Sequence, residues 1–242
     1  MMYLNERIDD LQRGGLRVIQ RADAFRFGTD AVLLADFAAP RRHDRVCDLG
    51  TGTGIIPLLL YARENTISAD AVEIQPDMAD MAARSMAMNG LNEKIRVLPG
   101  DLRSIRTLLP HARYDLVTCN PPYGKAGGTL LNPDASKRLA RHEESCAIED
   151  VACAAAWLLQ NGGRLCCVFP AARMIELSDA MRKYRMAPKR IRMVHSRVEK
   201  AAHLCLMDGM LDARPGLIIE PPLVIYDENN AYTPELRRIY GL

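Results

Sequence analysis

The sequence predicts an α/β protein with a mostly parallel sheet, helices on both of its faces and a C-terminal antiparallel hairpin. Between residues 45 and 169, short apolar runs that alternate with period two are separated by stretches with helical spacing. Each such pair indicates a βα unit, because parallel strands need a crossover to return the chain. The composition, with 48% hydrophobic and 26% charged residues, is typical of a folded globular protein.

The strands of this core are expected where apolar runs end at glycine, proline or a polar residue. They cover Arg45–Leu49, Ala71–Ile74, Ile95–Leu98, Tyr114–Cys119 and Arg164–Phe169. The helices between them carry their own start and stop residues, such as Pro76 and Asn89-Gly90. They cover Ile55–Arg63, Pro76–Asn89 and Ile148–Leu159.

The two flanks of the core carry further elements. Before the core, Leu11–Gln20 contains Gly14-Gly15 and predicts a hairpin. After it, we expect a helix over Ala172–Tyr184 and a strand at Ile191–His195. His203–Met210 and Leu217–Tyr226 have the pattern of two antiparallel strands joined by a turn at residues 213–216.

Membrane, disulfide and zinc functions are not indicated. No apolar run approaches the roughly 20 residues that a bilayer span needs. The seven cysteines are odd in number and include no C-x-x-C pair. Cys166 and Cys167 are neighbours on a predicted strand, so their thiols should point to opposite faces. We therefore expect a cytoplasmic protein without a membrane partner or a metal.

One stretch of the chain is strongly basic although the net charge is only +2. Between Arg182 and Lys200, eight lysines and arginines stand against the single acid Glu199. Such an excess is expected for a polyanionic partner. It is equally consistent with a solvated surface, and charge alone favours neither interpretation.

The first strand of the core runs into Asp48-Leu49-Gly50-Thr51-Gly52-Thr53-Gly54. Alternate glycines allow a tight turn from strand to helix and a close approach of the backbone to a ligand. The spacing is not the G-x-G-x-x-G of dinucleotide sites, and no G-K-[ST] of a P-loop follows. Taken alone, the glycine pattern is weak evidence for a ligand site, because a purely structural tight turn explains it equally well.

Acidic residues end the next two strands. Glu73 suits a ribose, whose vicinal hydroxyls both donate to a carboxylate, and Asp101 can accept from an adenine amine. Either acid alone would more often be a loop carboxylate or a helix cap. Three such features at the ends of three successive strands favour a nucleoside cofactor.

The fourth strand ends in Asn120-Pro121-Pro122-Tyr123. Proline restricts its own φ and the conformation of the residue before it, so the pair makes a stiff loop. That loop directs two acceptors, the Asn120 side chain and the Pro121 carbonyl, beside the aromatic ring of Tyr123. This set suits a planar group bearing an NH₂, and the alternative is a stiffened turn with a core tyrosine.

These residues, in this order, resemble the class I S-adenosylmethionine-dependent methyltransferases, whose fourth motif is [N/D]-P-P-[Y/F/W]. The resemblance implies a Rossmann-like fold with a seven-stranded sheet, and S-adenosyl-L-methionine as the cofactor. It also implies methylation of an amino nitrogen of adenine, guanine or glutamine.

A narrower resemblance extends from Asp10 to about Pro222. The stretches that carry it are similar to the bacterial tRNA(Val) adenine-N6 methyltransferases; they are residues 25–35, 50–59, 72–75 and 140–143. It implies N6-methylation of an adenosine beside the anticodon of a valine tRNA. Gly124 stands where that family usually has an aromatic residue, which leaves the details of base binding open.

The motifs, the basic stretch and the resemblance together assign roles to individual residues. Catalytic roles go to Asn120, Pro121 and Tyr123. Cofactor contacts go to Phe27, Thr29, Asp48, Gly50, Thr51, Gly52, Gly54, Glu73, Asp101 and Asn120. Substrate contacts go to Tyr123, Arg141, His142, Arg190 and Arg192. Thr29 serves equally well as a cap of a helix over Ala31–Phe37, and Arg141-His142 can cover the cofactor instead of binding RNA.

Three other functions stay open at this point. A glutamine side chain of a translation protein fits the same acceptors, as does a guanine amino group of rRNA. A non-catalytic RNA-binding module would keep the fold without the reaction. The sequence does not reveal the tRNA isoacceptor, the modified position or the oligomeric state.

We expect one domain over residues 1–242. Residues 1–40 form an N-terminal hairpin and helix, residues 41–170 a cofactor-binding core, and residues 171–242 the C-terminal part of the sheet with an RNA-binding edge.

Overall fold

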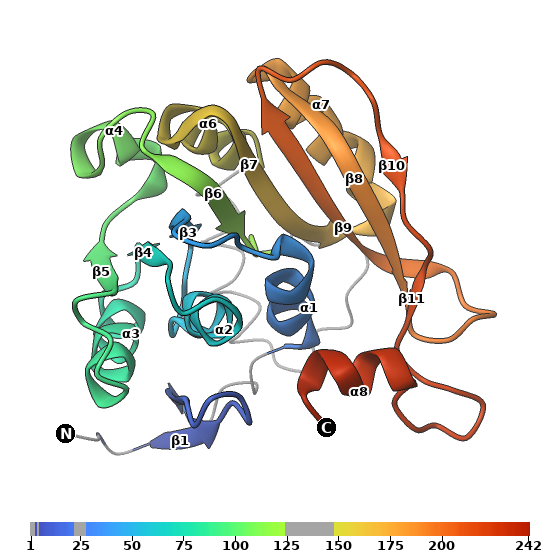
Figure 1. Ribbon diagram of the computed structural model, residues 1–242, viewed down its shortest axis with the longest axis horizontal. Helices are drawn as coiled ribbons and strands as arrows, with labels where there is room; N and C mark the ends of the chain where they lie inside the picture. Colours follow the sequence, from blue (N-terminus) through green and yellow to red (C-terminus); the bar gives the residue numbers. More distant parts are fainter. Residues whose placement is uncertain (1–2, 4, 22–27, 124–147) are drawn as a thin grey trace.

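The architecture is a mixed sheet with helices on both faces, seen in a computed structural model that describes residue 3 and residues 5–21, 28–123 and 148–242 (Figure 1). The strands of the sheet are β3 (Arg45–Leu49), β4 (Ser68–Glu73), β5 (Ile95–Pro99), β6 (Tyr114–Cys119), β7 (Leu159–Pro170), β8 (Met186–His195), β9 (Ala202–Leu211), β10 (Ile218–Ile219) and β11 (Leu223–Val224). Their order is β10-β8-β9-β7-β6-β3-β4-β5, and β11 also pairs with β8. The five strands from β7 to β5 in this order are parallel, as predicted.

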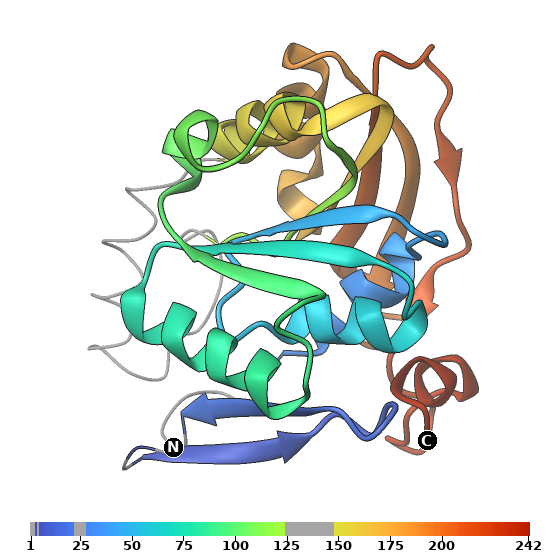
Figure 2. The same cartoon turned by 60° about the vertical axis from the view of Figure 1, so that its left-hand side comes forward.

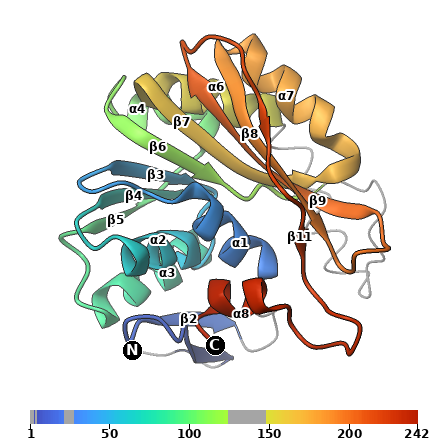
Figure 3. The same ribbon diagram turned by 45° about the vertical axis from the view of Figure 1, so that its right-hand side comes forward.

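Helices cover both faces of this sheet (Figure 3). They are α1 (Thr29–Ala38), α2 (Ile55–Arg63), α3 (Pro76–Met88), α4 (Ile105–Leu108), α6 (Ile148–Leu158), α7 (Met174–Lys183) and α8 (Pro234–Tyr240), with 3₁₀ turns η1 (Leu102–Ser104) and η2 (Ala171–Arg173). Two apolar cores result, one under α1 and α2 and the other under α6 and α7. Cys166 belongs to the first core and Cys167 to the second, which confirms that the two thiols face opposite ways. Burial raises the pKa of both thiols.

The C-terminal strands pair differently from the prediction. The antiparallel hairpin consists of β8 and β9, with Ile191 opposite Met207. The segment after it does not pair with β9, because β7 and β8 already occupy both sides of that strand. Instead β10 and β11 run parallel along the outer side of β8. They are two short pieces because Pro221 and Pro222 between them have no N–H to donate.

The predicted N-terminal hairpin is present, but it begins earlier than the predicted Leu11: its strands are β1 (Glu6–Asp10) and β2 (Arg17–Arg21). It lies against α3 and apart from the large sheet (Figure 2). The backbone N–H of Ile19 donates to Ser85 Oγ at 3.0 Å, and Arg84 forms an ion pair with Glu6. These contacts attach a two-stranded unit that would be only marginally stable alone.

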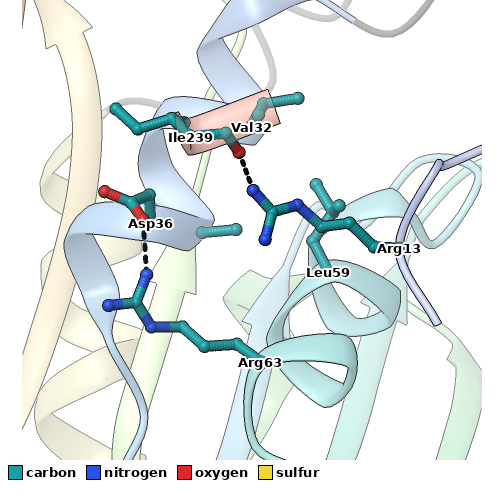
Figure 4. Close-up of a pocket in the computed structure, with 7 residues that line it drawn as sticks. Arg13, Val32, Asp36, Leu59, Arg63 and Ile239 are labelled. Carbon is teal, nitrogen blue, oxygen red and sulfur yellow. Dashed lines mark hydrogen bonds and ion pairs between the residues drawn. The ribbon is translucent and has the colours of Figure 1, made fainter. Parts of the chain in front are cut away.

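Helix α8 was not predicted, although its sequence carries ordinary helix signals. Thr233 accepts a capping hydrogen bond from the N–H of Leu236 at 3.3 Å, Pro234 opens the first turn, and Gly241 follows the last with φ 75°. Arg13 donates to the carbonyl of Ile239 at the C-terminal end of the helix (Figure 4). The short helix is therefore held at both ends.

Among the described residues, no helix combines the length and the apolar character that crossing a bilayer requires. The division of the chain into the three parts given above stays a prediction.

Candidate active site

The predicted site residues of the core strands, Asp48, Glu73, Asp101 and Asn120, lie where the parallel strands end. Strands β3 to β7 run in one direction, so their C-terminal ends meet at one edge of the sheet, which we call the carboxyl edge. Strand β8 shares this direction, because β7 and β8 both lie antiparallel to β9. Ligands of open α/β sheets bind at this edge.

The turn from β3 to α2 needs its glycines. Gly50, Gly52 and Gly54 have φ of 70°, 58° and 83°, which other residues rarely adopt. A Cβ on Gly54 would also lie 2.5 Å from Met86 Cε. A Cβ on Gly50 or Gly52 would meet nothing within 4 Å. The turn is therefore packed at its helix end and open along the other two glycines.

Glu73 fastens this turn to the neighbouring strand. Its carboxylate is buried, and its Oε2 accepts a hydrogen bond from the Gly52 N–H at 2.8 Å. Its Oε1 accepts from the Gln75 N–H at 2.8 Å. Each carboxylate oxygen retains a further lone pair that can accept a ligand's hydroxyl.

Asp48 is completely buried beneath the glycine turn. Its Oδ1 accepts a hydrogen bond from the Thr118 hydroxyl on β6 at 2.6 Å, whereas its Oδ2 and the Thr51 Oγ1 form no well-aligned hydrogen bond with any described residue. Burial raises the pKa of Asp48 to about 7, interactions with the Thr118 and Thr51 hydroxyls oppose this shift, and the charge of Glu73 adds to it. Buried polar atoms without a partner are rare and favour a site that a ligand completes.

Asp101 lies at the carboxyl edge as predicted, but it has a local partner. It accepts from the Arg103 N–H at 2.9 Å and forms an ion pair with the Arg103 guanidinium. Hydrogen bonding to Arg103 lowers the pKa of the Asp101 carboxyl. An adenine amine would share this carboxylate with Arg103.

The Asn-Pro-Pro-Tyr loop follows β6 directly. Asn120 is partly exposed, Pro121 is buried and Tyr123 is partly buried. The Tyr123 hydroxyl donates a hydrogen bond to Asn120 Oδ1 at 2.8 Å. Burial and the nearby Asp30 carboxylate raise the pKa of Tyr123, so the hydroxyl keeps its proton.

Phe169 is a neighbour of this loop that the sequence reasoning did not include. It is buried near the end of β7, and its ring meets that of Tyr123 edge to face at a centroid distance of 6.4 Å. The Arg173 guanidinium lies over the Phe169 ring, 5.0 Å from its centroid. Phe169 precedes Pro170 at the end of a predicted strand, and this position is the sequence signal that could have identified it as a site residue.

The N-terminus of α1 faces the same loop. Asp30 interacts electrostatically with Tyr123, and the Thr29 Oγ1 accepts from the Tyr240 hydroxyl at 3.2 Å. Gly28 occupies the N-cap position, and no side chain caps the helix there. Capping by Thr29 is therefore wrong. Phe27, Arg141 and His142 lie outside the described residues.

Arg190 and Arg192 have intramolecular partners. Arg190 pairs with the buried Asp208 at 2.7 Å and with Glu220 at 3.0 Å. Arg192 pairs with Glu235 at 2.8 Å. Phosphate binding by these two arginines stays a prediction.

The basic residues between Arg182 and Lys200 are spread from one edge of the sheet to the opposite edge. Arg182 and Lys183 end α7, just before β8 begins, and therefore lie at the edge opposite the site. Arg197 and Lys200 follow the end of β8 and lie at the carboxyl edge. Within the described part of the chain, no group of three or more His, Cys, Asp or Glu side chains is arranged to hold a metal ion.

The chain resembles known methyltransferases in sequence and in structure. Residues 22–190 match the methyltransferase small domain family. A tRNA1(Val) (adenine(37)-N6)-methyltransferase of Porphyromonas gingivalis is 32% identical, covering 91% of this chain and 89% of the relative. The enzyme of that name from Tolumonas auensis is 34% identical, covering 88% and 86%.

Solved structures show the same fold. A predicted O-methyltransferase from Agrobacterium tumefaciens superposes with a TM-score of 0.73 at 24% identity, covering 88% of this chain and 96% of that one. TrmN from Thermus thermophilus gives a TM-score of 0.55 at 23% identity, covering 76% and 48%. The chain therefore belongs to the methyltransferase small domain family, and within it to the group of the tRNA1(Val) (adenine(37)-N6)-methyltransferases.

Proposed function

We propose that this protein transfers a methyl group from S-adenosylmethionine to the N6 amine of adenosine 37 in tRNA1(Val), in the cytoplasm. The observation that carries the proposal is the position of Asn120 to Tyr123 at the end of β6, adjacent to the strand that bears the glycine turn. Relatives named for this reaction, which match nearly the whole chain, support the choice of tRNA and of position 37.

The glycine turn fits the cofactor. The space beside Gly50 and Gly52 admits a ligand against the backbone, and neither Asp48 Oδ2 nor Thr51 Oγ1 forms a well-aligned hydrogen bond with a described residue. We assign the amino-acid end of S-adenosylmethionine to this turn, its ribose to the Glu73 carboxylate and its adenine to Asp101. When bound, the cofactor supplies a methyl group activated by a sulfonium.

The loop after β6 acts on the other reactant, the target amine. An adenine N6 amine is a weak nucleophile because its lone pair is delocalised into the ring. Asn120 Oδ1 and the Pro121 carbonyl would accept its two N–H groups and favour a pyramidal nitrogen, whose lone pair is available for attack. This interaction is strongest in the transition state and therefore accelerates the transfer. The stiff Pro-Pro loop holds both acceptors in place before the base arrives.

The test is transfer of labelled methyl groups to tRNA1(Val) transcripts, followed by analysis of the nucleosides. We expect N6-methyladenosine at position 37 and no transfer to a transcript carrying A37→G. Asn120→Ala protein serves as the control for contaminating activity.

Each rival function gives a different product in this experiment. Labelled methylguanosine in rRNA would indicate a guanine substrate, and label confined to ribosomal protein would indicate a glutamine. Wild-type protein that binds S-adenosylmethionine but labels none of these substrates would be a binding module.

A further inference from the structure

Three tyrosines near the C-terminus form a continuous aromatic stack. The rings of Tyr226 and Tyr232 lie 5.5 Å apart between centroids at an angle of 27°. Those of Tyr232 and Tyr240 lie 5.5 Å apart at 15°. Both distances are in the range of favourable stacking. All three residues lie beyond residues 22–190 that match the family model, and the proposed methyl transfer uses none of them.

The inner end of the stack adjoins the methylation site. The Tyr240 hydroxyl donates to Thr29 Oγ1 at 3.2 Å, and the next residue, Asp30, interacts with Tyr123. Tyr123 in turn donates to Asn120. Contacts therefore run without a break from the stack to the proposed acceptor of the target amine.

Tyr226, at the outer end of the stack, is the most exposed of the three tyrosines. Tyr226 is 38% exposed, whereas Tyr232 and Tyr240 are partly buried. Tyr226 follows β11, which runs parallel to β8 with Val224 opposite His195, and so it emerges at the carboxyl edge. Its N–H donates to the Ser196 carbonyl at 3.0 Å, which places it beside the loop that follows β8. Figure 3 shows β11, the strand before it, next to the β8–β9 pair.

The segment that presents Tyr226 is fixed before any partner binds. Tyr226 and Tyr232 face each other in an antiparallel bridge, and the Asp227 carboxylate accepts from the N–H groups of Asn229 and Ala231, each at 2.9 Å. The Arg197 guanidinium donates to the Asp227 carbonyl at 3.0 Å. A ring held in this way loses little conformational entropy when another ring packs on it.

We infer that Tyr226 is a stacking platform for an unpaired nucleobase of the RNA, other than the base that is methylated. The inference rests on the proposed function and extends it by adding a second contact with the RNA. An exposed ring at the end of a stack accepts a base as the next layer, whatever its identity, because every base has a π face. Glu199 lies between Arg197 and Lys200 in the sequence, and Glu228 follows Asp227, whose carbonyl accepts from Arg197, so the contribution of this surface should come from stacking more than from charge.

The test measures the affinity of an anticodon stem-loop for wild-type protein and for Tyr226→Ala, Tyr226→Leu and Tyr226→Phe, by fluorescence anisotropy at several salt concentrations. We expect the Ala and Leu variants to raise Kd by about 5- to 150-fold and the Phe variant to stay within about twofold of wild type. The slope of log Kd against log salt should not change. In methyl transfer by the Ala and Leu variants, KM for the RNA should change more than kcat.

A second measurement alters the RNA and compares its binding to wild-type protein and to Tyr226→Ala. Loop nucleotides of the stem-loop are replaced one at a time by abasic ones, and one position other than 37 should weaken binding to wild type but not to Tyr226→Ala. A Tyr226→Ala affinity within twofold of wild type, full affinity in the Leu variant, or no such abasic position would overturn the inference. Failure of the proposed function would appear separately, as wild-type protein that binds the stem-loop without methylating it.

Discussion

The hydroxyl of Tyr123 donates a hydrogen bond to Oδ1 of Asn120, at 2.8 Å, within the loop that follows β6. The proposed acceptor of the target amine therefore already has one partner, and its second lone pair remains for the substrate. The bond also fixes the orientation of the Asn120 amide. The ring of Tyr123 lies edge-on to that of Phe169, and its role in the site is separate from that of the hydroxyl.

The ring and the hydroxyl of Tyr123 should therefore contribute differently. Tyr123→Ala removes a surface on which the target base can stack and should weaken RNA binding by about 1–3 kcal/mol without changing its salt dependence. Tyr123→Phe keeps the ring and should retain this affinity, while transfer slows less than tenfold because Asn120 is less well oriented. RNA titrations and single-turnover rates for both variants check this. Equal affinities for the Ala variant and wild type would exclude stacking on Tyr123.

Glu73 should serve the cofactor both directly and through the glycine turn. Glu73→Ala removes the acceptor of the Gly52 N–H and should weaken S-adenosylmethionine binding by about 1.5–3 kcal/mol. Glu73→Gln keeps one acceptor oxygen and should lose less. Calorimetric titration measures both affinities. An unchanged affinity in the Ala variant would remove Glu73 from the ribose site.

Asp48 should make stability depend on pH. Its pKa is raised by burial to about 7 from an ordinary value of 3.8. Between these values the folded protein holds a proton that the unfolded chain has released, so stability falls as pH rises toward 7. Asp48→Asn cannot ionise and keeps the oxygen that accepts from Thr118.

The comparison of wild type with Asp48→Asn isolates this group. From pH 5 to 7.5, the free energy of unfolding of wild type should fall relative to the variant by about 2.5 kcal/mol, because this window covers about two pH units of the shift. Urea unfolding at both pH values measures the difference. Parallel pH profiles would mean that Asp48 is ionised in the folded protein at pH 5.

Arg190 and Arg192 should contribute to stability, whether or not they also bind phosphate. Removing Arg190 leaves the buried Asp208, among the described cations, with the longer pairing to Arg164 at 3.6 Å. We expect Arg190→Ala to lower the free energy of unfolding by about 3 kcal/mol and the exposed control Arg182→Ala to have little effect. Urea unfolding measures these free energies. An Arg190→Ala protein as stable as wild type would show that Arg190 is a dispensable surface charge.

Phosphate binding by the same two arginines is tested by salt dependence. If both reach phosphate, neutralising them flattens the slope of log K against log salt by up to about two units. A slope equal to that of wild type would leave them with the structural role alone.

Local sequence signals predicted the strands and helices of the core well, because the ends of these elements are determined by neighbouring residues. The strand Tyr114–Cys119 and the helix Ile55–Arg63 have the predicted bounds, since a turn residue ends each apolar run. The partner of residues 217–226 could not be predicted in this way. Pairing depends on which strand edge is free after β9 is enclosed between its neighbours, and this is a property of the whole sheet.

The site shows the same division. The ends of successive strands placed Asp48, Glu73, Asp101 and Asn120 at one edge, as the alternation of strands and helices predicts. The pairings of Arg190 with Asp208 and of Arg192 with Glu235 join residues 18 and 43 positions apart in sequence. Sequence periodicity does not show contacts between residues so far apart, so the sequence alone left the basic stretch looking like a free surface.

The single-turnover rate of methyl transfer by Asn120→Ala tests the central claim most directly. The acceptor acts on the amine in the transition state, and each acceptor of this kind contributes about 2–4 kcal/mol. We expect the rate on a tRNA1(Val) transcript to fall by about 30- to 1,000-fold, while the affinity for S-adenosylmethionine changes little. Asn120→Asp, which keeps an acceptor oxygen, should retain more of the rate. A fall of less than tenfold in Asn120→Ala, with cofactor binding intact, would contradict the role assigned to Asn120.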